Sequence, residues 1–249
     1  MVDRLLASGL EYTVYLLEAG VLIYLLSRGL WKRHLGVSFY LLSLLAVDWA
    51  VRPYFYRHYG LDSLSYAYSY WLTDVLLALE AFGLMCIFFR RACMPKVWQV
   101  LRLSLIVVFV LIAAISFYYL SLSHHKDNLL HDFIYEFEQN LFFTCLVLNT
   151  LLYVMLQQIE SADRELGLFV CGMGILFAGP TAGLALVHVT LTGSFSIWLL
   201  AHVMPLCTLA MLLVWLYAIT AVQKDEKRGT EGSPSCMRVP ILAEAAGVK

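Results

Sequence analysis

The amino-acid sequence predicts an all-α membrane protein, a bundle of seven transmembrane helices with the N-terminus outside and the C-terminus in the cytoplasm. Of the 249 residues, 61% are hydrophobic and only 14% are charged, against about 25% charged in an ordinary soluble domain. The apolar residues form long runs, and most basic residues lie on one side of these runs. So few charged side chains exclude a soluble globule, a disordered chain and a basic nucleic-acid binder.

Each predicted span is a mostly apolar run between polar or turn-rich breaks. A helix needs about 20 such residues to cross a hydrocarbon core of about 30 Å. The seven runs are 11–30, 35–53, 66–89, 99–120, 132–156, 167–191 and 196–222. The last break is the shortest, so we expect a tight turn at Gly193. Residues 1–222 therefore form the predicted membrane domain, and 223–249 form a short cytoplasmic tail that we expect to be disordered.

Positive charge sets the predicted orientation. Four of the 17 basic residues lie at the ends of the spans that share a side with the N-terminus, namely Arg4, Arg52, Arg57 and Lys126. The other thirteen lie at the opposite ends or in the tail. Because cytoplasmic connections carry the excess of Lys and Arg, the N-terminus is predicted to be outside. The expected location is the plasma membrane, which is the inner membrane in a bacterium, with the lipid bilayer as the first partner.

Ionisable residues inside the spans are the main functional signal, since each costs about 2.5–3.5 kcal/mol at mid-helix. Counting about 1.5 Å per residue from the outer ends gives a shared depth of roughly 8–12 Å for one group of carboxylates. This group is Glu18, Asp48, Asp74 and Glu138. The imidazoles of His188 and His202 fall in the same outer half, whereas Glu80 reaches the inner half. The sequence therefore predicts an intramembrane polar layer.

Some of these residues have a local explanation. Asp48 and Arg52 are four residues apart on one helix, which predicts an intrahelical ion pair. The remaining acids have no such neighbour, and with Tyr70 they form the predicted ligand-binding set. This set is Glu18, Tyr70, Asp74, Glu80 and Glu138. His188 and His202 are either neutral packing residues or the nitrogen ligands of a metal ion.

Two further patterns concern the arrangement of the helices. The helix at 132–156 has polar side chains on two faces, which predicts that protein surrounds it at the centre of the bundle. The helix at 167–191 contains Gly172, Gly174, Gly179 and Gly183. These glycines, together with Pro180 and with Pro205 in the last span, predict kinked and mobile helices, with tight helix packing as the alternative.

The sequence contains no phosphate-binding loop, dinucleotide fingerprint or HExxH motif, so an enzyme is less favoured than a binding protein. We predict a membrane sensor or ligand-binding protein whose outward-facing pocket takes a small molecule or a cation. One alternative is a divalent-metal site at His188 and His202, including a metallo-hydrolase. Another is a proton- or cation-coupled carrier with Asp74 and Glu80 as relay carboxylates. Retinal is not expected, because 196–222 contains no lysine for a Schiff base.

Overall fold

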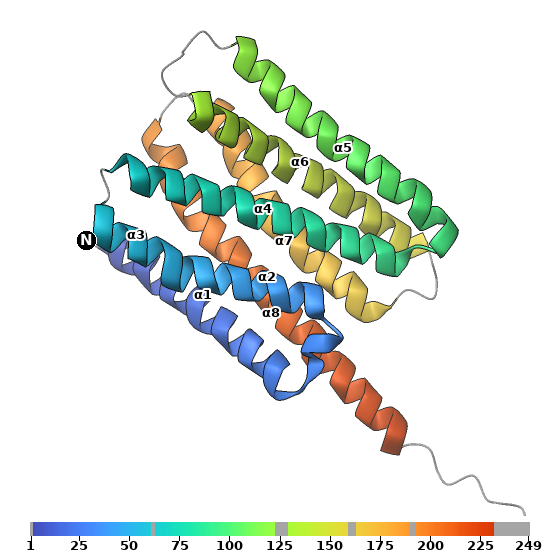
Figure 1. Ribbon diagram of the computed structural model, residues 1–249. Helices are drawn as coiled ribbons and strands as arrows, with labels where there is room; N and C mark the ends of the chain where they lie inside the picture. Colours follow the sequence, from blue (N-terminus) through green and yellow to red (C-terminus); the bar gives the residue numbers. More distant parts are fainter. Residues whose placement is uncertain (1, 61–62, 123–128, 159–162, 190–192, 232–249) are drawn as a thin grey trace, which may run out of the picture.

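The computed structural model describes residues 2–60, 63–122, 129–158, 163–189 and 193–231 (Figure 1). Within these ranges the chain consists of helices and short connections and contains no β-strand. Seven helical segments of the described chain are long and apolar enough to cross a membrane. The structure thus confirms the predicted all-α class and the predicted number of apolar segments.

The helices follow one another with short connections. They are α1 (Val2–Ser27), α2 (Leu35–Ala46), α3 (Arg52–Tyr59), α4 (Leu64–Ala92), α5 (Pro95–Leu122), α6 (Leu129–Gln158), α7 (Arg164–Val189) and α8 (Gly193–Glu231). A 3₁₀ turn, Leu30–Lys32, lies between α1 and α2. A π-helical turn, Val47–Val51, joins α2 to α3, and these three elements form one membrane-length segment, Leu35–Tyr59.

Several helix ends differ from the predicted span ends, and two helices extend well beyond the predicted C-terminal end of their span. The second span was expected to end at residue 53, but the helix continues to Tyr59. Pro53 lies in the first turn of α3, where its missing N–H is tolerated, and the wider turn before it lets the Arg52 N–H bond the Val47 carbonyl. Helix α8 continues past the predicted end at residue 222 to Glu231. The rest of the predicted tail, 232–249, and the connection before Gly193 lie outside the described residues.

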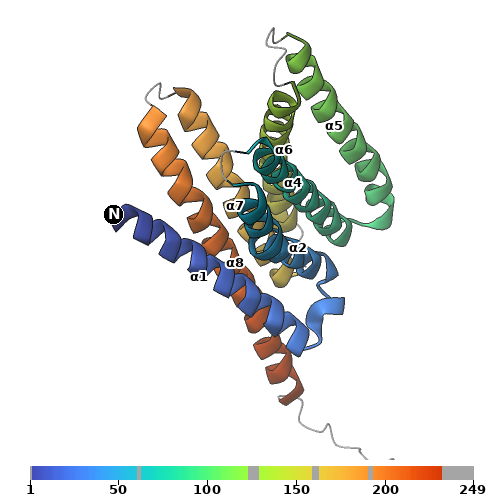
Figure 2. The same ribbon diagram turned by 60° about the vertical axis from the view of Figure 1, so that its left-hand side comes forward.

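Six of the membrane-length segments form a closed ring. In ring order they are α1, α2 with α3, α4, α6, α7 and α8, and α8 packs again against α1. Helix α5 lies outside this ring and packs against α6 and α4 (Figure 2). Helices that are far apart in the sequence are therefore neighbours, and the interior of the ring is where their side chains meet.

Helix α6 is a member of the ring, which corrects its predicted place at the centre of the bundle. It packs against α4, α5 and α7. Its two polar faces nevertheless both contact protein. Asn140 Nδ2 donates a hydrogen bond of 3.1 Å to Ser116 Oγ on α5, while Glu138 faces the interior of the ring. The polar pattern therefore identified a helix with protein on two sides.

One half of the ring is densely packed. Its largest fully buried side chains include Leu25, Met85, Leu152, Phe169 and Trp215. These residues lie toward the ends of α1, α4 and α6, near the start of α7 and in the second half of α8. The packed core therefore occupies the half of the bundle opposite the start of α1.

Glycines bring α7 close to its neighbours. A methyl group at Gly172 would lie 2.6 Å from Trp215 Nε1, and one at Gly179 would lie 2.5 Å from Cys207 Sγ, both on α8. One at Gly174 would lie 2.7 Å from Asn149 Nδ2 on α6. Small residues allow this approach between membrane helices. At these positions the structure shows the tight packing that was the alternative to mobile helices.

Replacing Gly172 by alanine should destabilise the protein by about 1–3 kcal/mol, because the added methyl overpacks the contact. Trp215 cannot give way easily, since it is fully buried and donates its Nε1–H to the Phe169 carbonyl at 3.1 Å. Thermal unfolding of the detergent-solubilised protein measures the change. Gly167→Ala is the matched control on the same helix, because its methyl meets nothing within 4 Å. Equal Tm values for the two variants would contradict the packing argument.

Candidate functional site

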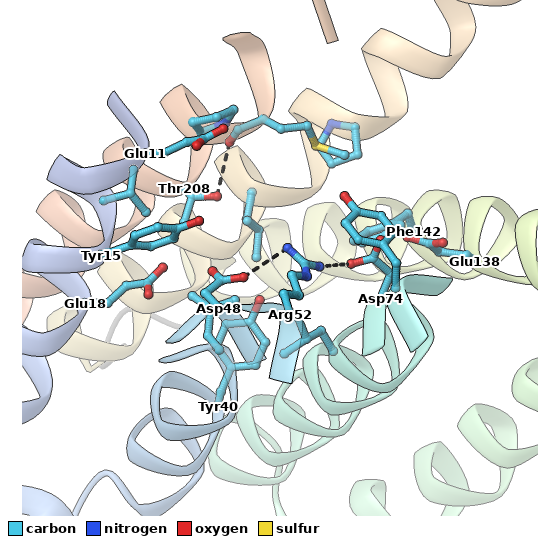
Figure 3. A pocket seen from close by; sticks show the side chains of 18 residues that line it. Glu11, Tyr15, Glu18, Tyr40, Asp48, Arg52, Asp74, Glu138, Phe142 and Thr208 are labelled. Carbon is cyan, nitrogen blue, oxygen red and sulfur yellow. Dashed lines mark hydrogen bonds and ion pairs between the residues drawn. The ribbon is translucent and has the colours of Figure 1, made fainter. Parts of the chain in front are cut away.

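A cavity of about 530 Å³ lies inside the ring, in the half that contains the start of α1 (Figure 3). All six members of the ring contribute described lining residues, and α5 contributes none of them. The lining residues are Glu11, Val14, Tyr15, Glu18, Tyr40, Leu44, Asp48, Arg52, Tyr70, Asp74, Leu77, Glu138, Phe142, Leu176, Pro180, Met204, Pro205 and Thr208. The cavity therefore begins where the packed core ends.

Five carboxylates line this cavity. Glu11 and Glu18 come from α1, Asp48 from the π turn, Asp74 from α4 and Glu138 from α6. The spacing of Glu11, Tyr15 and Glu18 places them on one face of α1. The structure thus brings four members of the predicted ligand-binding set, Glu18, Tyr70, Asp74 and Glu138, to one space.

Arg52 is the only basic residue among the described residues that line the cavity. Its Nη1 donates to Asp48 Oδ1 at 3.0 Å, which confirms the predicted intrahelical pair. Its Nη2 also donates to Asp74 on the neighbouring helix. Asp74, which has no partner in the local sequence, therefore has one across the interface. The guanidinium carbon lies 4.5 Å from the ring centroid of Tyr70, so Tyr70 holds Arg52 in place by a cation–π contact.

Glu18 differs from these paired acids. Only 1% of the residue is exposed. Among the described residues neither of its carboxylate oxygens has a hydrogen-bond partner, and its side chain points into the cavity (Figure 3). An unpaired buried carboxylate is costly when ionised, and when protonated it still has a donor and an acceptor to satisfy. Glu18 is thus the least satisfied polar group of this site.

The remaining predicted site residues are not among those that line the cavity. Glu80 lies on α4, and its buried Oε2 atom has no hydrogen-bond partner among the described residues. It is six residues from Asp74, and about 100° of rotation per residue turns it toward a different side of α4. His202 lies on α8 but is not a lining residue. The His188 side chain lies outside the described part of the chain. Within that part, no group of three or more His, Cys, Asp or Glu residues could hold a metal ion.

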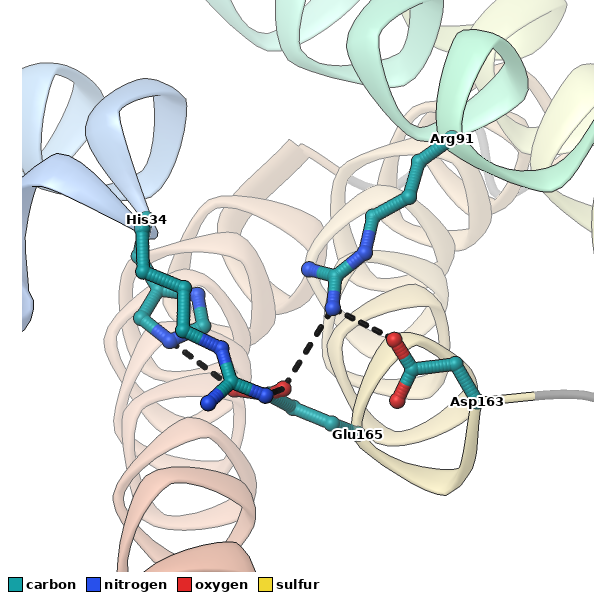
Figure 4. A network of polar contacts seen from close by, with 5 residues as sticks. His34, Arg91, Asp163 and Glu165 are labelled. Carbon is teal, nitrogen blue, oxygen red and sulfur yellow. Dashed lines mark hydrogen bonds and ion pairs between the residues drawn. The ribbon is translucent and has the colours of Figure 1, made fainter.

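A second polar cluster (Figure 4) lies near the start of α2, the end of α4 and the start of α7, at the end of the bundle opposite the start of α1 (Figure 1). Glu165, at the start of α7, has only 2% of its side chain exposed. It accepts from His34 Nε2 at 2.9 Å and from Arg33 Nη2 at 3.1 Å, both before α2. Arg91, at the end of α4, lies 3.4 Å from the same carboxylate and also pairs with Asp163. This cluster therefore links the connection before α2, the end of α4 and the start of α7.

One feature of the sequence indicated the Glu165 cluster. The predicted topology places the connections that contain Arg33, Arg91 and Glu165 on the same side of the membrane. Opposite charges in those connections could therefore meet. In the sequence, residues 32–34 and 160–165 appear only as breaks between spans, so the cluster is not predicted.

Aromatic rings connect the cavity to the Glu165 cluster. Tyr40, which lines the cavity, has its ring centroid 6.1 Å from that of Trp215. Trp215 lies 5.8 Å from Phe169, and Phe169 lies 5.4 Å from the His34 ring. His34 in turn bonds Glu165. A continuous chain of contacts therefore crosses the packed half of the ring.

Comparisons of the chain with protein-family models, with curated proteins and with solved structures found no match. The chemistry that the cavity offers is that of its own groups. Carboxylates and aromatic faces both attract positive charge. Arg52 is already engaged by two acids, so the groups that are left for a ligand are predominantly acidic.

Proposed function

We propose that this protein is an integral membrane sensor or ligand-binding protein whose cavity takes up an organic cation. Charge supports this proposal, because five lining carboxylates stand against one guanidinium. The main support for it is the environment of Glu18. The buried carboxylate of this residue points into the cavity and has no hydrogen-bond partner among the described residues. A cationic group at this position would supply the missing hydrogen bonds and the missing counter-charge.

The size and the wall of the cavity favour a small organic molecule over a single ion. A volume of about 530 Å³ falls within the range of about 300–1,000 Å³ that is typical of small-molecule sites. Tyr15, Tyr40 and Phe142 add aromatic surface to the carboxylates. Aromatic faces bind alkylammonium groups as well as apolar carbon.

The proposed direction of entry is from outside the cell. The cavity is in the half of the bundle that contains the start of α1, and the distribution of basic residues predicts this half to be outermost. Fully buried side chains, among them Leu25, Met85 and Trp215, fill the other half. This arrangement favours a pocket with one entrance, and hence binding, over a path for transport.

Ligand binding would be communicated through the aromatic contacts below the cavity. A ligand that displaces Tyr40 acts on Trp215, on Phe169 and then on the His34–Glu165 pair. Packed cores respond to such displacements by discrete rearrangement because they have little free volume. The signal would be read at the predicted cytoplasmic end, at the connection before α2 and along the extension of α8.

Thermal unfolding of the detergent-solubilised protein tests the proposal. We expect butylammonium or spermidine to raise Tm and an alkyl sulfonate to have no such effect. A ligand at a hundredfold excess over its Kd stabilises by about 2.7 kcal/mol. Glu18→Gln should remove most of the shift, because the amide keeps the size of the side chain and loses its charge.

Glu80→Gln is the matched control, since it makes the same replacement in the bundle outside the lining of the cavity. This variant should respond like the wild type. The proposal is wrong if neither cation raises Tm, or if Glu18→Gln and Glu80→Gln respond alike.

A further inference from the structure

The lining carboxylates are divided between two sides of the cavity. Glu11 and Glu18 project from α1, while Glu138 projects from α6 beside Asp74 (Figure 3). In the ring, α1 packs against α2 and α8, whereas α6 packs against α4, α5 and α7. The two acidic groups therefore belong to helices on opposite sides of the ring.

The two acids between these sides, Asp48 and Asp74, already share a counter-charge. Arg52 lies there, bonded to Asp48 through Nη1 and to Asp74 through Nη2, with Tyr70 over its guanidinium. Figure 3 shows Glu18, Asp48, Arg52, Asp74 and Glu138 in this order across the cavity. A ligand that crosses the centre meets an internally paired arginine.

Apolar side chains complete the wall between the two acidic sides. They include Leu77 on α4, Leu176 on α7 and Met204 on α8, helices that lie between α1 and α6 in the ring. Such a surface favours contact with an alkyl chain. It contains no carboxylate that could pair with a third positive charge. Along the cavity, one acidic side is thus followed by the paired arginine and the apolar wall, and then by the second acidic side.

We infer that the ligand is an elongated dication, an α,ω-diamine, with one ammonium group at Glu18 and the other at Glu138. The inference rests on the proposed function and specifies the ligand class of the same site. The alkyl chain contacts the apolar wall, and each ammonium group donates hydrogen bonds to a carboxylate. Glu18 supplies an independent observation, because it is 1% exposed, unpartnered within the described chain and directed into the cavity.

A length series tests the inference without any substitution. Binding to the detergent-solubilised wild type is measured by calorimetry for unbranched α,ω-diamines of increasing length, each paired with the alkyl monoamine of the same carbon number. We expect an optimum length at which the diamine binds at least about tenfold more tightly than its monoamine, as one additional charge-assisted hydrogen bond in a buried site provides.

Amide variants then identify the carboxylate that binds each end of the diamine. Glu18→Gln and Glu138→Gln should each reduce the affinity of the best diamine to about that of the monoamine, and Glu80→Gln should keep the full preference for the diamine. If the monoamine binds as tightly as the diamine at every length, the dication inference is wrong while the proposed function stands. If neither amine series binds, the proposed function fails as well.

Discussion

Replacing Arg52 by methionine should lower the free energy of unfolding by about 3 kcal/mol, the low end of the cost of removing one partner from a buried ion pair. The guanidinium bonds both Asp48 and Asp74, and the three side chains are 25%, 11% and 24% exposed. Methionine preserves the apolar part of the side chain and leaves two acids without their counter-charge. Denaturant titration in detergent measures the change.

Two further variants make this prediction specific. Arg57→Met removes an exposed arginine of the same helical segment, so its effect should stay within about 0.5 kcal/mol. Adding Asp48→Asn and Asp74→Asn to Arg52→Met should restore much of the lost stability, because no unpaired charge is left. A triple variant as unstable as Arg52→Met alone would show that packing, and not charge, is the role of Arg52.

Replacing Glu165 by glutamine should cost about 3–5 kcal/mol, because it leaves cationic groups near the buried position without their shared carboxylate. Glu165 and His34 have only 2% and 3% of their side chains exposed. Arg33 and Arg91 both approach the same Oε2 atom, at 3.1 and 3.4 Å. The connection before α2, the end of α4 and the start of α7 would lose their common contact, as a denaturant titration would show.

Asp163→Asn is the control for Glu165→Gln. Asp163 also pairs with Arg91, but 42% of its side chain is exposed, and exposed pairs contribute about 0–1 kcal/mol. Only the buried member of the cluster should therefore give a large effect. If both variants lose the same stability, the burial of Glu165 does not determine its contribution.

The sequence allowed the apolar segments to be placed and the depth of their acids to be predicted. Helix rise is constant, so residue number translates directly into depth. For this reason the acids assigned to one depth, Glu18, Asp48, Asp74 and Glu138, do line one cavity. Glu80 is predicted to lie in the inner half by the same count of residues, and it is not a lining residue.

Rotation of each helix about its axis could not be predicted in the same way. Arg52 reaches Asp74 only because α2, the π turn and α3 present it toward α4. The pair of Arg52 with Asp48 is evident from their spacing in the sequence, whereas the pair with Asp74 on α4 is not. Similarly, the polar faces of α6 were recognised, but which face meets α5 and which meets the cavity follows from packing.

By itself, the sequence determined how many apolar helices this protein has and which acids share a level within them, because both depend on length and hydropathy along one chain. The tertiary structure alone decided that α5 lies outside a ring of the other spans, that Arg52 joins two acids and that Glu18 has no partner among the described residues. These features depend on close contacts between helices, such as Gly172 against Trp215. Those contacts fix the rotation and the neighbours of each helix, which hydropathy does not encode.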